Sequence, residues 1–317
     1  MRAVGVLEFG GPEKLQVVEL PTPIPGTGQV RIKVHAAAVN PTDTLFREGA
    51  MAARAKIQEP PFIPGMDVSG VVDEVGPGND DRLKVGDRVV AMVLPSSEFG
   101  GAYAQEIVLP ATSVVHAPKS ADFASASTLI MNAMTARLAL DALALSPGNT
   151  LAVTGAAGAY GAYVVQLALE DGLKVIADAA PSDIELVRSL GEVQIVPRGN
   201  GVATDILKLC PEGVDGFADG SIQDELVVPA IKDGGGLAVV RGWKGEPGRG
   251  VTVHRIAVPT AAHDTAGMQR LVDQVDAGVL TLRVADVLPA SAARSAHERL
   301  QAGGVRGRIV LDFVNFG

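Results

Sequence analysis

Three glycines spaced three residues apart stand at the centre of this chain, in the stretch LAVTGAAGAYG at positions 151–161. Gly155, Gly158 and Gly161 follow a short apolar run and precede a helical pattern that starts near Tyr160. Glycines in such a turn let the backbone approach a ligand closely, and the positive end of the following helix attracts a phosphate. The order of strand, turn and helix predicts a cradle for the pyrophosphate of a dinucleotide, with tight packing as the alternative.

An acidic residue follows the glycine turn at the distance expected for a ribose-binding side chain. Asp178 ends the next apolar run, about twenty residues beyond Gly158. There it can accept both ribose hydroxyls of NAD and would repel the additional phosphate of NADP. The alternative is a solvated residue in the loop ADAAPSD. Arg198, Arg241 and Lys244 are candidate partners for that phosphate, so both coenzymes stay open.

The elements that must position these residues follow two patterns. Residues 1–120 alternate short β-rich runs with Gly, Pro and Asp, which predicts an all-β barrel or sandwich. Residues 121–261 alternate strands with helical patterns such as AYVVQLALEDG, IELVRSLG and IQDELVVPAI, which predicts a doubly wound parallel sheet. Residues 262–317 have no place in such a sheet, and we expect them to complete the N-terminal domain.

Composition excludes several classes of function. The 317 residues suffice for two domains, and 47% hydrophobic with 20% charged residues is typical of a globular protein. A net charge of −9 without a run of Lys and Arg disfavours nucleic acid. The N-terminus lacks a signal-peptide pattern and no window is long enough to span a bilayer, so we expect a cytoplasmic location without a membrane partner. The single cysteine, Cys210, excludes an intramolecular disulfide and a cysteine zinc cluster.

A series of segments along nearly the whole chain carries a family resemblance. In order, they are PTPIPGTGQVRIKVHAAAVNPTDTLFREG, PFIPGMDVSGVVDEVG, LKVGDRVVAM, GGAYAQEIVLP, NAMTARLAL and TGAAGAYG. They resemble the medium-chain dehydrogenase/reductase superfamily, and most of all its zinc-free branch of quinone oxidoreductases and zeta-crystallin. The resemblance implies an α/β fold in which a Rossmann doubly wound parallel sheet domain is inserted into a GroES-like β-barrel domain.

The resemblance also implies that no metal is bound. Zinc-dependent members of the superfamily place zinc ligands where this chain has Asn40, Met66 and about Met131. An amide and two thioethers are poor zinc ligands. Asp43 and Asp67 are neighbours of these positions, but two carboxylates without His or Cys make an unconvincing zinc site.

The same resemblance assigns roles to individual residues. Asn40 would lie beside the nicotinamide and Thr135 would contact the coenzyme, which makes both catalytic candidates. A turn-stabilising Asn before a proline and a helix Thr bonded to its own backbone are the alternatives. The predicted coenzyme-binding residues are Gly155, Gly158, Ala159, Tyr160, Gly161, Asp178, Arg198, Arg241, Gly242 and Trp243.

The activity implied by the resemblance is transfer of hydride from NADPH, or alternatively NADH, to a quinone or an α,β-unsaturated carbonyl. Leu45 and Phe46 stand where many quinone oxidoreductases have a tyrosine, which favours the broader description of an activated carbonyl acceptor. An enoyl-thioester or biosynthetic reductase is one alternative, and a coenzyme-binding sensor or structural protein without turnover is another. The resemblance also implies a homodimer formed through the edge of the Rossmann sheet, at the strand GVTVHRIAV.

Overall fold

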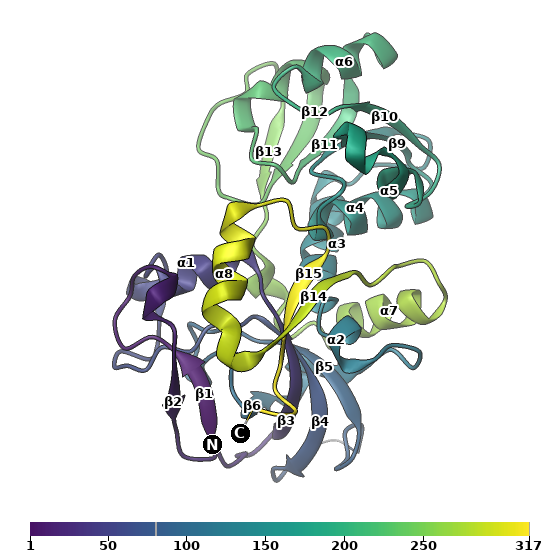
Figure 1. Ribbon diagram of the computed structural model, residues 1–317. Helices are drawn as coiled ribbons and strands as arrows, with labels where there is room; N and C mark the ends of the chain where they lie inside the picture. Colours follow the sequence, from purple (N-terminus) through teal and green to yellow (C-terminus); the bar gives the residue numbers. More distant parts are fainter. Residues whose placement is uncertain (80, 317) are drawn as a thin grey trace. The chain divides into compact units, whose positions relative to one another are not determined.

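The computed structural model describes residues 1–79 and 81–316, which form two compact units (Figure 1). Unit 1 comprises Met1–Met131, Pro259–Ala277 and Leu282–Gly317, and unit 2 comprises Asn132–Val258 and Gly278–Thr281. Residues 121–131, which the sequence pattern groups with the parallel-sheet domain, cluster with unit 1 instead. Two hydrogen bonds connect this segment to unit 1: Ser69 donates to the Phe123 carbonyl, and Asp67 accepts a bond from the Met131 amide.

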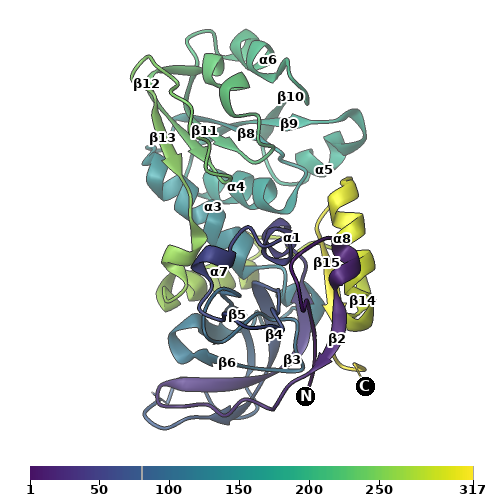
Figure 2. The ribbon, with the colours of Figure 1, turned by 90° about the vertical axis from the view of Figure 1, so that its left-hand side faces the viewer.

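Unit 1 is built on a mainly antiparallel sheet that mixes strands from both ends of the chain. Among the described residues its order is β14-β15-β3-β4-β5-β7, with β6 paired to β3. Figure 2 labels strands β3, β4, β5, β6, β14 and β15 of this sheet. The strands are β3 (Gln29–Ala38), β4 (Asp67–Val75), β5 (Arg88–Met92), β6 (Glu106–Pro110), β7 (Val114–His116), β14 (Val284–Pro289) and β15 (Arg308–Asp312). A separate antiparallel pair joins β1 (Arg2–Gly5) to β2 (Gln16–Glu19).

The C-terminal segment returns to this unit, as the sequence pattern predicts. Strand β15 pairs antiparallel with β3, with Val310 opposite Ala38. Every second residue of β3 from Val30 to Val34 is buried, and this face packs with Ile309 and Leu311 of β15. The helices of the unit are α1 (Pro41–Arg47), α2 (Phe123–Ala126), α7 (Thr265–Asp276) and α8 (Ala293–Ala302).

Unit 2 contains a parallel sheet in the order β10-β9-β8-β11-β12-β13. Its strands are β8 (Thr150–Thr154), β9 (Lys174–Ala179), β10 (Val193–Pro197), β11 (Val214–Asp219), β12 (Ile231–Val239) and β13 (Thr252–Arg255). Its helices are α3 (Ile130–Leu143, starting at the end of unit 1), α4 (Ala159–Glu170), α5 (Ile184–Arg188) and α6 (Val202–Leu209). Counted along the chain this is the order 3-2-1-4-5-6 of a dinucleotide-binding sheet, which places the ligand edge at the carboxyl ends of β8 and β11.

A row of apolar side chains in register holds this sheet together. Ile176, Ala152, Phe217 and Leu237 lie opposite one another on β9, β8, β11 and β12. All are buried in one cluster with the apolar face of α6. Strands buried on both faces form a stiff platform, so the loops at their carboxyl ends have defined positions.

One predicted helix is absent from the described structure. The segment IQDELVVPAI forms two 3-10 turns, Asp224–Leu226 and Val228–Ala230, in place of an α-helix. Asp219 accepts bonds from the amides of Gln223 and Asp224, and Pro229 has no amide hydrogen to continue an α-helical ladder. No helix in the described residues is both long and apolar enough to cross a membrane.

Candidate active site

The three glycines after β8 differ in why glycine is required at each position. Gly155 has φ of +69°, and a Cβ there would lie 3.0 Å from the Gly220 carbonyl. At Gly161 a Cβ would lie 2.3 Å from the Gly155 oxygen, so this glycine is required for packing of α4 against the turn. At Gly158 φ is −76°, and a Cβ would meet only the Gly155 oxygen, at 3.1 Å. A side chain at Gly158 would therefore occupy the space that a ligand at this helix end needs.

Helix α4 begins directly at this turn and directs its positive end toward it. Gly158 is the N-cap and Ala159 the first helical residue. Twelve residues of α4 provide the aligned peptide dipoles that favour an anion at the N-terminus. Tyr160 lies in the first turn, and a Cβ added at Gly220 would be 2.9 Å from its ring. Ala159 and Tyr160 thus form the first turn of α4, directly after the glycine turn.

Two buried polar atoms beside the turn have no hydrogen-bond partner in the described chain. They are the Tyr160 hydroxyl and Oδ2 of Asp178. Burial, and after it the Asp219 carboxylate, raises the pKa of Tyr160, so its phenol stays protonated. Buried polar groups are normally paired, and groups left unpaired at a loop of this type fit a site that receives a polar ligand. The turn and these atoms fit a bound dinucleotide.

Asp178 is buried inside β9, and the alternative of a solvated loop residue is wrong. Its side chain is 1% exposed, and Oδ1 accepts a bond of 3.1 Å from the Ala156 amide in the glycine turn. Burial raises the pKa of Asp178, whereas the Ala156 amide and the Arg198 charge lower it. One carboxylate oxygen therefore already braces the turn, and only Oδ2 is left for another partner.

The structure brings one of the predicted cations to this region and separates the others from it. Arg198 is exposed directly after β10, its amide donates to the Ala179 carbonyl, and its charge acts on Asp178. Arg241 and Gly242 follow β12, which β8 and β11 separate from β9 in the sheet. Trp243 packs against the apolar cluster of unit 2, and its carbonyl accepts a bond of 2.7 Å from Arg255.

In unit 1, Asp67 connects the positions that the resemblance assigns to zinc ligands. Its Oδ2 accepts a 2.8 Å bond from Nδ2 of Asn40, and its Oδ1 accepts a 2.8 Å bond from the Met131 amide. Asp67 and Asn40 are fully buried. Burial raises the pKa of Asp67 to about 6, against the lowering effect of these two donors. Thr135, the other catalytic candidate, is a buried residue of α3 in unit 2.

The donor set at these positions does not fit zinc. Met66 and Met131 offer thioether sulfur and Asn40 an amide, whereas zinc selects thiolate, imidazole and carboxylate. In the described residues no three His, Cys, Asp or Glu side chains are grouped so that they could hold a metal. The residues at these positions therefore do not fit a zinc ion.

The sequence did not indicate that Asp43 is connected to further buried polar side chains in unit 1. The Asp43 carboxylate accepts bonds from the Asn40 amide, the Gly65 amide and the Tyr103 hydroxyl. Tyr103 also contacts His297, which contacts Arg47. His297 follows Arg47 by 250 residues, so no local pattern could have indicated the contact. Arg47 stands between Asp43 and Glu48 in the sequence, so its neighbours along the chain did not mark it as a buried residue.

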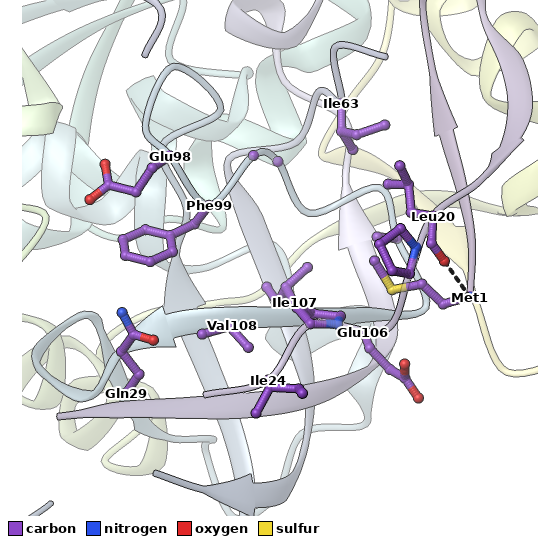
Figure 3. Close-up of a pocket in the computed structure, with 15 residues that line it drawn as sticks. Met1, Leu20, Ile24, Gln29, Ile63, Glu98, Phe99, Glu106, Ile107 and Val108 are labelled. Carbon is purple, nitrogen blue, oxygen red and sulfur yellow. Dashed lines mark hydrogen bonds between the residues drawn. The ribbon is translucent and has the colours of Figure 1, made fainter. Parts of the chain in front are cut away.

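An apolar pocket of about 330 Å³ lies elsewhere on unit 1 (Figure 3). Leu20, Ile63, Phe99 and Ile107 border it, and near them the Met1 amino group donates to the Leu20 carbonyl at 2.7 Å. None of the residues predicted for the site lines this pocket. The pocket is therefore separate from the residues to which we assign chemistry.

Comparison with known proteins places these features in a family. Residues 26–119 match the alcohol dehydrogenase GroES-like domain family, and residues 191–311 match the zinc-binding dehydrogenase family. Quinone oxidoreductase of Mus musculus is 30% identical over 98% of this chain and 97% of that protein. A solved mycobacterial protein complexed with NADPH has 28% identity and a TM-score of 0.86, covering 98% of this chain and 100% of that chain.

Other relatives align over a shorter length. Quinone oxidoreductase of Pongo abelii is 37% identical over 185 residues, which is 58% of this chain and 54% of that protein. A GroES-like domain combined with a parallel sheet of dinucleotide-binding order defines a two-domain dehydrogenase or reductase. The chain belongs to the medium-chain dehydrogenase/reductase superfamily, in its quinone oxidoreductase branch. The predicted fold class is thereby confirmed.

Replacement of Gly158 by valine should abolish coenzyme binding while the protein stays folded. The reason is that φ at Gly158 suits any residue and an added Cβ meets only the Gly155 oxygen, while the side chain would compete with the phosphates for the space at this helix end. Calorimetric titration with NADPH and NADH measures binding, and thermal unfolding measures stability. Gly161→Val is the control, because it should lower stability strongly. Unchanged affinity in Gly158→Val would contradict the cradle.

Replacement of Asp67 by asparagine should change how stability depends on pH. The pKa of Asp67 is raised in the folded state to about 6 from an ordinary value of 3.8, so the folded protein favours the protonated form. The contribution of Asp67 to stability is present below about pH 4 and is lost as pH rises through 6. The wild type should therefore lose about 3 kcal/mol relative to Asp67→Asn between these limits. Urea unfolding of both proteins across this range measures it, and parallel pH profiles would contradict the assignment.

Proposed function

We propose that this protein is a zinc-independent, NADPH-dependent reductase that transfers hydride to a quinone or an α,β-unsaturated carbonyl. The observation that carries the proposal is the glycine turn of unit 2, with its open position at Gly158 and its two unpaired buried polar atoms. Membership of the quinone oxidoreductase branch supports the choice of acceptor. The hydrogen-bonded arrangement of Asn40, Asp67 and Met131 supports a mechanism without zinc.

The charges at the carboxyl ends of β9 and β10 favour NADPH over NADH. Arg198 is an exposed cation in this region, able to pair with the additional phosphate of NADPH. Asp178 would oppose that phosphate, but it is buried and its Oδ1 is bonded to the Ala156 amide of the turn, so only Oδ2 is unpaired. The likeness to a mycobacterial protein complexed with NADPH supports the same choice.

The residues of this chain would act mainly by binding and orientation. NADPH, when bound, supplies the hydride for the electron-poor carbon of the acceptor. The glycine turn and α4 would hold the pyrophosphate, and Thr135 would contact the coenzyme. Asn40, held by Asp67, would lie beside the acceptor, where placement of the reacting groups lowers the barrier. Arg241, Gly242 and Trp243 would line the nicotinamide end.

A homodimer through the edge of the parallel sheet is part of the proposal. Among the described residues β13 pairs with β12 alone and so forms one edge of this sheet. An exposed strand edge offers backbone groups for pairing with a second copy of the chain.

A panel of acceptors tests the activity. Quinones, enones and enoyl thioesters are each mixed with protein and NADPH, and the loss of absorbance of the reduced coenzyme is followed. We expect turnover with quinones or enones. Preference for enoyl thioesters would identify a biosynthetic reductase instead. Tight coenzyme binding without oxidation by any acceptor would indicate a sensor or structural protein.

Replacement of Arg198 by alanine should weaken NADPH binding about tenfold and leave NADH binding unchanged. A hydrogen bond to a charged group contributes about 1.5–3 kcal/mol, and NADH lacks the phosphate that would accept it. Titration of wild type and variant with both coenzymes measures the effect. Arg188→Ala, an exposed arginine of α5 that pairs with Glu185, is a matched control. Equal loss for both coenzymes would contradict a role in phosphate recognition.

A further inference from the structure

A chain of buried polar side chains in unit 1 connects the C-terminal helix α8 to the start of α1. Nη1 of Arg47 lies 3.3 Å from Nδ1 of His297, and Nε2 of His297 lies 3.2 Å from the Tyr103 hydroxyl. That hydroxyl lies 3.3 Å from Oδ2 of Asp43. All four side chains are fully buried. This series of hydrogen bonds therefore connects the Arg47 cation, on one turn of α1, to the Asp43 carboxylate on the preceding turn, and all its members are shielded from solvent.

The direction of every hydrogen bond in this chain follows from the chemistry of its members. The Arg47 guanidinium can only donate, so Nδ1 of His297 has to accept. Burial, and after it the Arg47 charge, lowers the pKa of His297 to about 3, so the ring is neutral and its proton is on Nε2. Nε2–H then donates to the Tyr103 oxygen, which leaves the tyrosine O–H to donate to Asp43.

We propose that Arg47, His297 and Tyr103 form a one-way chain of hydrogen-bond donors that ends on the Asp43 carboxylate and thereby positions Asn40. Reversal of the chain would put an N–H on Nδ1, directly against the Arg47 donor. The orientation is therefore locked by the arginine and does not depend on any ligand. His297 and Tyr103 are positioning residues, because they act on Asn40 through Asp43.

The series of hydrogen bonds ends at Asp43, which holds Asn40. The proposed function places Asn40 beside the reacting groups. Oδ2 of Asp43 accepts the Asn40 amide at 2.7 Å, and Oδ1 accepts the Gly65 amide at 3.2 Å. All three partners of Asp43 are donors, so a proton on this carboxyl would find no acceptor among them. Protonation of Asp43 would loosen the hold on the Asn40 backbone, whereas the bond that Asn40 donates to Asp67 comes from its side chain.

The charges around Asp43 decide where it titrates. Burial and, more weakly, the neighbouring Asp67 of β4 raise the pKa of Asp43 to about 7, whereas the amides of Asn40 and Gly65 and the Tyr103 hydroxyl lower it. His297 of α8 is neutral, Arg47 of α1 is cationic, and Arg308 of β15 acts on Asp67. Asp43 is therefore a carboxylate above about pH 7 and becomes protonated as the pH falls through this value.

Tyr103→Phe tests the proposal, because it removes one hydroxyl from the chain and keeps the ring. In the variant the pKa of Asp43 should rise by about one unit, the change that loss of a hydrogen bond to a charged group produces. The carboxyl ¹³C resonance of Asp43 measures this shift directly. The acid limb of kcat/KM for the best acceptor of the panel should move upward by the same amount. In the wild type, ¹⁵N spectra should show His297 protonated at Nε2.

Tyr163→Phe is the matched control, since it removes the hydroxyl of a buried tyrosine on α4 in unit 2. It should leave the Asp43 titration and the acid limb in place. A wild-type ring protonated at Nδ1, or an Asp43 resonance that titrates identically in wild type and Tyr103→Phe, overturns the donor chain. If the Asp43 resonance shifts in Tyr103→Phe but the acid limb of kcat/KM stays in place, the positioning of Asn40 is overturned. The inference on Asn40 rests on the proposed function, but the two spectra test the chain even if no acceptor is reduced.

Discussion

Buried carboxylates that accept backbone amides are the interaction on which both units of this protein depend. Asp43, Asp67, Asp178 and Asp219 are each 1% exposed or less, and each accepts at least one bond from a main-chain N–H. An unpaired charge in such surroundings would be strongly destabilising, so each carboxylate dictates the path of the backbone that supplies its donors. The loops at the candidate site are held in this way.

In unit 2 this constraint shapes the glycine turn before any ligand arrives. Asp178 on β9 holds the turn through the Ala156 amide, and Asp219 on β11 accepts a 2.6 Å bond from the hydroxyl of Thr154 at the end of β8. The turn is thus fixed from the strands on both sides of β8. A binding loop that is already ordered loses less conformational entropy when the ligand binds, which favours affinity.

In unit 1 a buried carboxylate connects two segments of the backbone, as a metal ion connects its ligands. Asp67 joins the start of α1 to the start of α3 by two hydrogen bonds, as a shared metal ion would join its ligands. A carboxylate cannot act as a Lewis acid, however, and cannot polarise a carbonyl as zinc does. The proposed acceptors, a quinone or an enone, are already activated by conjugation and do not need this polarisation.

The sequence by itself determined the features that depend on neighbouring residues. The glycine spacing, the strand before it and the helix after it are local, and so the turn at Gly155–Gly161 could be predicted together with the alternation of strands and helices. The return of the C-terminal strand to β3 was also predictable, because a finished doubly wound sheet left it no other place. Local pattern failed at residues 222–231, where Asp219 at the end of β11, four and five residues before Gln223 and Asp224, accepts the amides of the expected helix. Tertiary structure alone decided that Asp178 is buried, that Asp67 joins Asn40 to Met131, and that Arg47 meets His297. The physical reason is that burial and the pairing of charges depend on contacts between residues tens to hundreds of positions apart, which no window along the chain contains.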